Sequence, residues 1–492
     1  MLKQPITRAL ERLLTPVDIA WLAAFRIMFG LAMCVSMLRF IAFSWIDAYF
    51  VRPSFHFKYY GFAWVEPLPG PQLHALFWAL AVLSLCVALG LFFRVAAWAF
   101  ALGFMYAQLL DVTLYLNHYY LAGLLSLLLA CTPAHRAWSL DAWRKPELRR
   151  DTVAAGVHWL LRFQIGVVYT FAGLAKATSD WLVHHQPLRI WLGSHTEMPV
   201  LGVVFRQLWA APAMSWAGFL FDTTIVWWLL YRRTRPFAYL VVLAFHAMTS
   251  LLFPIGMFPV IMSMAALLFF SPSWPRAVLR LRARTAVMAP PVPMPDALHG
   301  VALAAGALYC LIQLALPMRY LAYDGTVLWH EQGMRFSWRV MVREKNGSID
   351  LLARDTQTGQ QRIVSPSRYL TQEQEREMSS QPDLILQLAH HVKRQLEAEH
   401  GHRFEVRVDS HVSLNGRRAR PLIDPAVDLS TVRDGLAQAT WITPPPTDPP
   451  PHLRPVQRVS ATPETPQKQP QSRLDRPANA GRPTNLPGHT SG

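Results

Sequence analysis

The chain has 492 residues, of which 52% are hydrophobic, and its mean hydropathy of +0.20 is high for a soluble protein. The 18 Trp and 26 Phe residues fit aromatic belts at two membrane interfaces. A net charge of +16 would favour nucleic acid in a soluble protein, but here the basic residues gather in short loops between apolar runs, so we expect a lipid bilayer as partner and no nucleic acid.

Apolar runs near the length needed to cross a bilayer, about 20 residues, recur along residues 1–317. Residues 1–16 form a basic amphipathic lead-in without a small-residue cleavage site, which we expect to stay uncleaved. We predict an all-α polytopic membrane bundle of about nine spans, the fourth and eighth short enough to be tilted or re-entrant. The predicted spans are 18–45, 73–93, 95–113, 118–132, 156–176, 212–231, 237–253, 257–271 and 297–317.

Lys and Arg are unevenly distributed between alternate loops of this bundle. One side, which includes the N-terminus, holds most of them, for example in 144–150 and 276–284. Cytoplasmic loops carry such an excess, so we predict a cytoplasmic N-terminus and, after an odd number of spans, an extracytoplasmic C-terminal part. The opposite side holds only Arg52, Lys58, Arg189 and Arg206 before the ninth span.

Residues 318–440 change character and predict a small extramembrane α+β domain. Apolar and polar residues alternate from 333 to 365, and residues 383–401 have helical spacing that ends at Gly401. Residues 441–492 are rich in proline and predict a disordered tail. Predicted strand turns lie at Asn346-Gly347, Thr358-Gly359 and Asn415-Gly416.

Lys176 ends an apolar run at 157–176 and has two interpretations. It is either an anchor whose amine snorkels to the membrane interface, or a desolvated lysine whose free amine acts as a base. The predicted topology places it on the outer side, at the same depth as the Asn117–His118 pair and the segment 245–258. We therefore expect these segments to converge.

Other polar residues in the spans have plainer interpretations. Arg26, Arg162 and Asp222 are expected to form structural ion pairs, because charges inside a membrane usually pair with one another. Asp111 is a candidate helix-end acceptor that fixes the Asn117–His118 turn. We interpret His118 and His246 as core histidines whose ring nitrogens are hydrogen-bonded. We expect the four cysteines to be buried thiols, neither disulfide partners nor metal ligands; they are Cys34, Cys86, Cys131 and Cys310.

Taken together, eight stretches in order resemble the vitamin K-dependent gamma-carboxylase family, whose bacterial members are often labelled horizontally transferred transmembrane domain proteins. The resemblance covers roughly residues 20–430. The matching stretches are FRIMFG (25–30), LDVTLYLNHYYLAGLL (110–125), WSLDAW (138–143), RFQIGVVYTFAGLAKATSDWL (162–182), AFHAMTSLLFPIGMF (244–258), FFSPSWP (269–275), FSWRVMV (336–342) and LIDPAVDLS (422–430).

The resemblance implies a carbon–carbon lyase and quinol monooxygenase of the bacterial inner membrane. Such an enzyme oxidises reduced vitamin K or a related quinol with O2 to the epoxide, without a metal. The alkoxide base formed removes a γ-proton from glutamate in a peptide or secreted protein, and the carbanion adds CO2.

The resemblance also implies roles for individual residues. Lys176 would be the free-amine base, with His118 and Asn117 helping to hold the site. His246, Asp111 and Met257 are expected to bind the quinone. We expect the Lys176 amine and the His118 ring within direct or one-water hydrogen-bonding reach, roughly 3–5 Å.

Two departures from the animal enzymes keep other functions open. The folded part ends near 440, where animal carboxylases continue with further β-structure, and Ala175 stands where they have a second lysine. The alternatives are a quinol epoxidase without carboxylation and a non-catalytic module that binds quinone or lipid. A binding module needs no base, so the presence of Lys176 together with His118 distinguishes an enzyme from a binding module.

Overall fold

The computed structural model describes residues 11–281 and 296–451. The start of the predicted lead-in, residues 1–10, and most of the predicted disordered tail, residues 452–492, lie outside the described residues.

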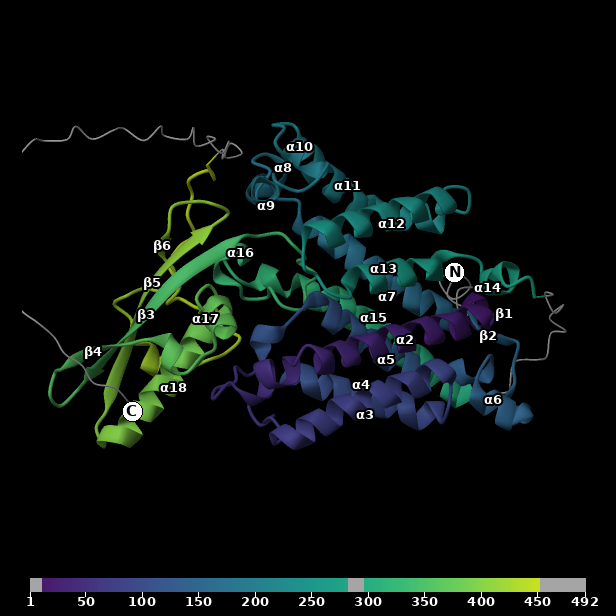
Figure 1. Ribbon diagram of the computed structural model, residues 1–492, viewed down its shortest axis with the longest axis horizontal. Helices are drawn as coiled ribbons and strands as arrows, with labels where there is room; N and C mark the ends of the chain where they lie inside the picture. The colour runs from purple at the N-terminus through teal and green to yellow at the C-terminus, as the bar shows by residue number, and fades with distance from the viewer. Residues whose placement is uncertain (1–10, 282–295, 452–492) are drawn as a thin grey trace, which may run out of the picture. The chain divides into compact units, whose positions relative to one another are not determined.

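Each of the predicted spans coincides with a helix, and Figure 1 shows most of these helices running side by side. Within the described residues, five helical stretches are long and apolar enough to cross a membrane: Ala20–Ala42, Gly70–Leu89, Ala210–Leu230, Arg235–Leu252 and Gly300–Ala322. That the others also cross stays a prediction. The helices are α2 (Ala20–Ala42), α3 (Gly70–Leu89), α4 (Phe93–Leu109), α5 (Asn117–Ala130), α7 (Ala155–Ala175), α11 (Ala210–Leu230), α12 (Arg235–Leu252), α13 (Phe258–Ala266) and α15 (Asp296–Met318).

Short elements connect these helices. Strand β1 pairs with β2 in an antiparallel ribbon, and Figure 1 places this ribbon at the same end of the bundle as α6. The connecting elements are β1 (Pro16–Asp18), α6 (Leu140–Arg144), β2 (Thr152–Ala154), α8 (Ser179–Leu182), α9 (Leu188–Ser194), α10 (Leu201–Phe205), α14 (Trp274–Val278) and α16 (Val327–His330).

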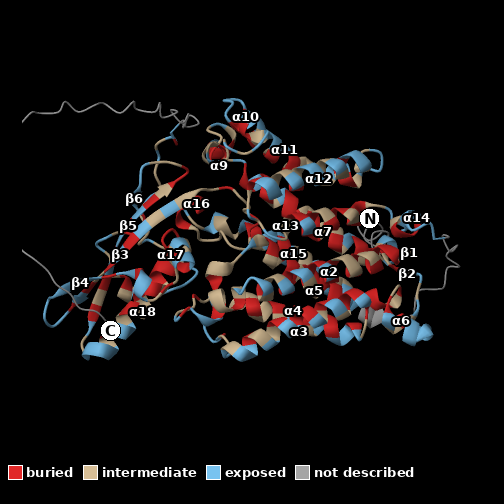
Figure 2. Cartoon of the chain, viewed as in Figure 1, coloured by how far each residue is buried: buried red, intermediate tan, exposed pale blue. Residues whose placement is uncertain are grey.

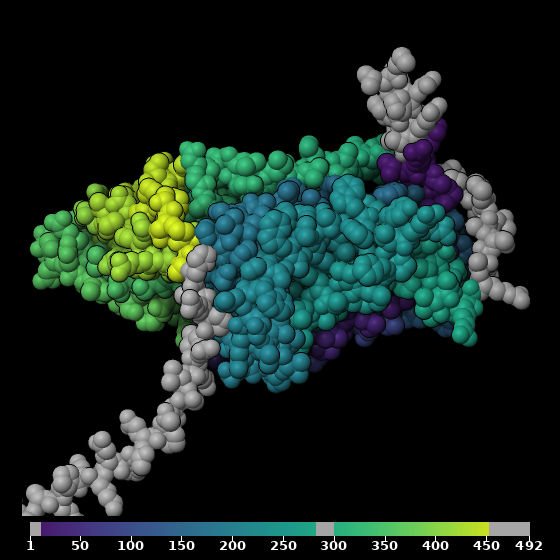
Figure 3. All heavy atoms as spheres, turned by 90° about the horizontal axis from the view of Figure 1, so that it is seen from above, coloured from purple at the N-terminus to yellow at the C-terminus, as the bar shows by residue number. Residues whose placement is uncertain are grey.

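The outer faces of the bundle are apolar. On α3, Trp78, Val82, Leu85 and Leu89 are all exposed, and their spacing of three and four residues puts them on one face. Figure 2 shows the buried residues concentrated where helices face one another, and Figure 3 shows α11 and α12 covering one face of the bundle. Contiguous apolar stripes of this kind are stable in lipid rather than in water, so the protein is an integral membrane protein.

The C-terminal part combines a four-stranded antiparallel sheet, of order β4-β3-β5-β6, with two helices. Along β5 every second residue is buried, and Val406 and Val408 face the apolar side of α18, which includes Leu388 and Val392. The elements are β3 (Lys345–Asp355), β4 (Gln361–Val364), α17 (Gln372–Met378), α18 (Pro382–His400), β5 (Phe404–Leu414) and β6 (Arg420–Pro421).

Two of the three predicted turns are confirmed, and one is wrong. Asn415 and Gly416 have φ of 52° and 78° between β5 and β6, and Gly359 has φ 73° between β3 and β4. Asn346-Gly347 instead lies inside β3. A Cβ added at Gly347 would lie 2.5 Å from the carbonyl oxygen of Ser379, so this glycine serves close packing rather than a turn. The helix predicted over 383–401 is α18, which ends at Gly401 with φ 72°.

The first residues of the predicted tail contact the sheet. Ile442 forms an isolated antiparallel bridge with Ile423, and the Thr443 hydroxyl donates to the carbonyl of Pro421 at 2.5 Å. The Asp448 carboxylate lies 2.9 Å from Arg420. Residues 441–451 therefore extend the packing of the domain.

The expected structural ion pair forms for Asp222, which pairs with Lys176, but not for the two arginines. The expected burial of the cysteines is also wrong. Arg26 donates to the carbonyls of Ala134 and Trp138, and Arg162 donates to those of Leu268, Phe269 and Phe270, so neither arginine pairs with Asp222. Backbone carbonyls left open at helix ends satisfy both guanidinium groups. Cys131, which directly follows α5, is exposed rather than buried, and the other three cysteines are partly buried. Cys131 and Cys310 both line a cavity in the bundle.

Candidate functional site

Lys176 points into the bundle and forms a buried ion pair. It follows the last residue of α7, and its Nζ lies 2.7 Å from Oδ2 of Asp222 on α11. Both residues are only 5% exposed. The amine also donates to the carbonyl of Ala172 at 3.2 Å. An amine held in this way does not reach lipid or the interface, so the snorkelling interpretation is wrong.

Gly173 brings the two helices close enough for this pair. A Cβ added there would lie 2.6 Å from Cγ2 of Thr223 and 2.8 Å from its backbone nitrogen. Glycine therefore lets α7 and α11 approach directly beside Asp222, one turn before Lys176. The short distance between the Lys176 amine and the Asp222 carboxylate depends on how closely these two helices cross.

A segment of the extramembrane domain covers the pair. We call residues 336–342 the cover segment. Its Val340 carbonyl lies 3.5 Å from the Lys176 amine, its Phe336 amide donates to the Tyr115 hydroxyl at 2.8 Å, and its Trp338 ring stacks on Tyr120. Phe336, Trp338 and Met341 all have positive φ, between 52° and 61°. Such left-handed backbone costs roughly 1–3 kcal/mol per residue and persists where surrounding contacts hold it in place.

The two histidines of the predicted site both lie near the ring of Phe258. The His246 and His118 rings lie 5.9 Å and 6.1 Å from the Phe258 ring, measured between centroids. Nε2 of His246 shares a hydrogen bond with the Tyr169 hydroxyl at 3.0 Å, whereas its buried Nδ1 has no partner among the described residues. His118 is 6% exposed, so neither histidine faces bulk solvent.

Phe221 connects these histidines to the ion pair. It precedes Asp222 on α11 and contacts the rings of Tyr169 and His246 at 5.7 Å and 6.3 Å. Phe221 and Phe258 thus connect polar residues of four helices, α5, α7, α11 and α12, into one contiguous cluster. We call Lys176, Asp222, Tyr169, His246 and His118 the polar cluster.

We expected Lys176 and His118 to be within reach of a hydrogen bond, either direct or through one water, and the direct bond is not made within the described part of the chain. The amine's hydrogen-bond acceptors are Asp222, Ala172 and Val340. A contact between the two side chains through one water stays a prediction.

The other predicted site residues lie around this cluster. The Asn117 side-chain oxygen accepts from the Tyr115 hydroxyl at 3.0 Å. Asp111 accepts from the amide of Thr113 at 2.9 Å and from the side chain of Gln374 on α17 at 2.8 Å, so it caps the turn before α5 and holds the extramembrane domain. Met257 directly precedes α13 and is partly buried. That Asp111 and Met257 bind a quinone stays a prediction.

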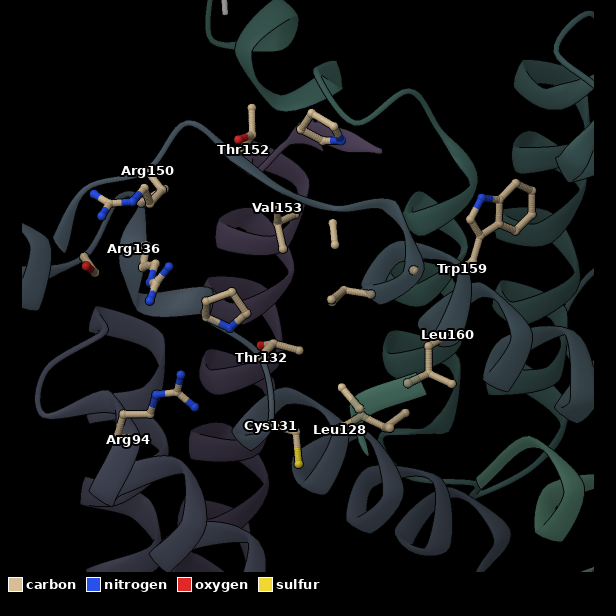
Figure 4. Close-up of a pocket in the computed structure, with 18 of the residues that line it drawn as sticks. Arg94, Leu128, Cys131, Thr132, Arg136, Arg150, Thr152, Val153, Trp159 and Leu160 are labelled. Atoms are coloured by element: carbon tan, nitrogen blue, oxygen red, sulfur yellow. The ribbon is translucent and has the colours of Figure 1, made fainter. Parts of the chain in front are cut away.

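A large cavity of about 3120 Å³ lies elsewhere in the bundle. Gly156, Trp159 and Leu160, near the start of α7, line it (Figure 4). Lys176 lies at the other end of this 21-residue helix, about 30 Å away at 1.5 Å per residue. The cavity is therefore not the site around Lys176.

Sequence reasoning missed Asp222 and the cover segment as parts of the site. A lone carboxylate in an apolar span was the available signal for Asp222, but the choice of its partner depends on which helices are neighbours. Among the described residues no group of three or more His, Cys, Asp or Glu side chains is placed to hold a metal.

These features define an integral membrane protein in which a buried lysine–aspartate pair is covered by an extramembrane α+β domain. Residues 14–274 match the family model of the HTTM domain, and residues 299–448 match that of the vitamin K-dependent gamma-carboxylase lumenal domain. The chain belongs to the vitamin K-dependent gamma-carboxylase family and is a carboxylase-like membrane protein. No solved structure matches it.

Proposed function

We propose that the protein is a vitamin K hydroquinone-dependent enzyme that couples quinol oxygenation to carboxylation of glutamate in a peptide. The observation that carries this proposal is the Lys176 amine, which is buried in an apolar bundle 2.7 Å from Asp222 and beneath the cover segment. The matches to both family domains support the same assignment.

In the proposed reaction, Lys176 Nζ accepts the proton of a quinol hydroxyl. In this proposal the Lys176 amine is a free base while Asp222 holds the proton that the two side chains share. Asp222 is thus a positioning residue that also stores a proton. The quinol, with O2, supplies the strong base that removes the γ-proton of glutamate before CO2 adds to the carbanion.

The residues around the pair fit a flat aromatic diol. The His246 Nδ1 and the Trp338 Nε1 are buried polar atoms without a hydrogen-bond partner in the described part of the chain, and each such atom costs roughly 1–3 kcal/mol unless a ligand or water satisfies it. The rings of Phe221 and Phe258 provide apolar walls beside His246. A quinol offers both the hydroxyls for the polar atoms and a ring for these walls.

The charge distribution and the name of the lumenal domain model support a proposal for the location. We propose a bacterial inner membrane, with the N-terminus in the cytoplasm and the α+β domain outside. A glutamate-containing peptide or secreted protein would then approach from the side of the cover segment. A bilayer-dissolved quinol would enter between the helices.

One observation favours a non-catalytic alternative. The Lys176 amine has three acceptors, namely Asp222 and the carbonyls of Ala172 and Val340, and this is the full capacity of an ammonium group. A permanently charged, fully satisfied lysine would hold the two domains together in a module that binds quinone or lipid.

An activity assay separates these functions. Purified protein in detergent is given reduced vitamin K, O2, labelled CO2 and a glutamate-containing peptide, with oxidised vitamin K as the control. Epoxide together with label in the peptide supports the carboxylase, and epoxide alone supports an epoxidase. Quinol binding without either product contradicts an enzyme and supports the binding module.

A further inference from the structure

The large cavity is a groove between α15 and the rest of the bundle. Only 11% of the apolar stretch Gly300–Ala322 is buried, so α15 stands apart from its neighbours over much of its length. The α15 wall of the groove is made largely of small residues, including Ala302, Ala305 and Gly306. Leu31 of α2, Leu128 of α5 and Leu160 of α7 line the facing side. The groove is therefore long and largely apolar.

One end of this groove carries concentrated positive charge. Its lining contains five arginines and a single carboxylate, Asp151. Arg276 pairs with Asp18 at 2.8 Å and with Asp151 at 3.4 Å, so its charge is balanced. The other four arginines are Arg94, Arg136, Arg149 and Arg150.

Arg94 and Arg136 face a shared space. In Figure 4 both side chains extend toward the gap between the helix that carries Arg94 and the loop that carries Arg136. The Nε of Arg136 is buried and has no hydrogen-bond partner among the described residues. Burial, followed by the like charges of Arg150 and Arg94, lowers the pKa of Arg136, as expected where cations face one another without an anion between them.

Exposed tryptophans are also part of the lining of the groove. Trp98, Trp143 and Trp159 line the groove and are 40%, 72% and 48% exposed. Tryptophan is enriched at the depth of lipid headgroups. The groove volume of about 3120 Å³ also exceeds the roughly 300–1,000 Å³ of pockets for small polar molecules.

We propose that this groove binds an anionic phospholipid, with its phosphate between Arg94 and Arg136 and its acyl chains along the small residues of α15. The guanidinium groups match a phosphate in charge and geometry. The apolar part of the groove matches the acyl chains. The site lies at the opposite end of α7 from Lys176 and is independent of the proposed reaction.

Native mass spectrometry of the full-length protein in detergent tests this site. Phosphatidylglycerol and phosphatidylcholine with identical chains are compared. Each basic side chain near an anionic lipid contributes about fivefold, so we expect the wild type to prefer phosphatidylglycerol by about 30-fold. Arg94→Gln/Arg136→Gln should abolish the preference, and Arg94→Lys/Arg136→Lys should keep most of it.

Matched control variants test where the phosphate and the acyl chains of the lipid bind. Arg232→Gln/Arg233→Gln removes two exposed arginines outside the groove lining and should leave the preference unchanged. Ala305→Trp fills the groove and should weaken binding of phosphatidylglycerol, whereas Ala304→Trp, outside the lining on the same helix, should not. The Ala305→Trp arm remains informative if the arginine variants fold poorly.

Several outcomes would overturn the proposal. These are equal binding of the two lipids by the wild type, an equal loss in Arg232→Gln/Arg233→Gln, or unchanged binding in Ala305→Trp. Complete displacement of phosphatidylglycerol by millimolar inorganic phosphate would show that the arginines hold an anion only, and would also contradict a lipid site.

Discussion

Lys176 and Asp222 lie 46 positions apart and meet only because α7 and α11 pack together. Removing one member of a buried ion pair leaves the other charge unpaired, which typically costs about 3–5 kcal/mol, whereas replacing both by apolar residues is often neutral. We therefore expect Asp222→Leu and Lys176→Met each to be strongly destabilised, and the double variant to be more stable than either. Thermal unfolding in detergent measures the coupling.

Additive changes in stability would contradict this prediction. If the two single substitutions are additive in the double variant, the ion pair contributes no coupling energy and Lys176 is not held by Asp222.

The predictability of the site varies from residue to residue. Lys176, His118 and His246 stand out in the sequence because polar residues in apolar spans are rare. The partner of Asp222 did not follow from the sequence, because four cations occur in the other predicted spans and only the packing of the helices decides between them. The two arginines we expected to pair found backbone carbonyls instead.

At the scale of elements, the crossing of α7 and α11 sets the geometry of the site. Gly173→Ala would place a methyl group 2.6 Å from Thr223 Cγ2 and force the helices apart. Overpacking of this kind typically costs about 1–3 kcal/mol, and epoxide formation should fall because the Lys176–Asp222 distance changes.

Gly166 provides the matched control on the same pair of helices. A Cβ there would lie 3.6 Å from Val226, an ordinary contact, so Gly166→Ala should be neutral or slightly stabilising in thermal unfolding. Equal effects of the two alanine substitutions would show that close packing at Gly173 has no special role.

A second contact between elements links α8 to the turn after β5. The Arg417 guanidinium binds both carboxylate oxygens of Asp180, at 2.6 Å and 2.7 Å, and Asn415 donates to the same group at 2.7 Å. Burial acts to raise the pKa of Asp180, but the hydrogen bonds from Arg417 and Asn415 outweigh it and hold this pKa below its usual value. The contact therefore stabilises the fold above the pKa of the unfolded chain.

This stability is lost as the pH falls through the lowered pKa of Asp180, because protonation removes the charge that Arg417 binds. Arg417→Ala should lower stability by about 3 kcal/mol near neutral pH and flatten its decline in acid. Arg418→Ala, at an exposed neighbour, should do neither. Melting temperatures measured between neutral and acid pH report both effects. If the melting temperatures of the wild type and of Arg417→Ala fall with pH in parallel, protonation of Asp180 is not linked to the stability of the fold.

Elements were predicted better than their junctions. Apolar runs fixed the helices, and Gly401 fixed the end of α18. The misplaced turn at Asn346-Gly347 arose because glycine serves both turns and close packing, and only the approach of Ser379 distinguishes the two. The stretch that forms the cover segment, FSWRVMV, stood out as a family motif, but its path over Lys176 did not follow from the sequence, since its left-handed residues are aromatic and methionine rather than glycine.

At the scale of the whole molecule, the orientation in the membrane follows from the distribution of Lys and Arg. A reporter fused after residue 451 should be active only in the extracytoplasmic compartment, because the α+β domain follows an odd number of predicted spans. A fusion after Arg233, between α11 and α12, should report the cytoplasm. Cytoplasmic activity of the fusion after residue 451 would contradict an outward-facing site.

The central claim is that Lys176 acts as a base on the quinol, and epoxide formation by variants of Lys176 tests it most directly. Lys176→Ala should lose about 10²–10⁴-fold in rate, and a small added amine should restore part of it in proportion to its free-base fraction. Lys176→Arg should fail nearly as badly, because a guanidinium group stays protonated. An active Lys176→Arg variant, or a Lys176→Ala variant with the rate of the wild type, would contradict the account.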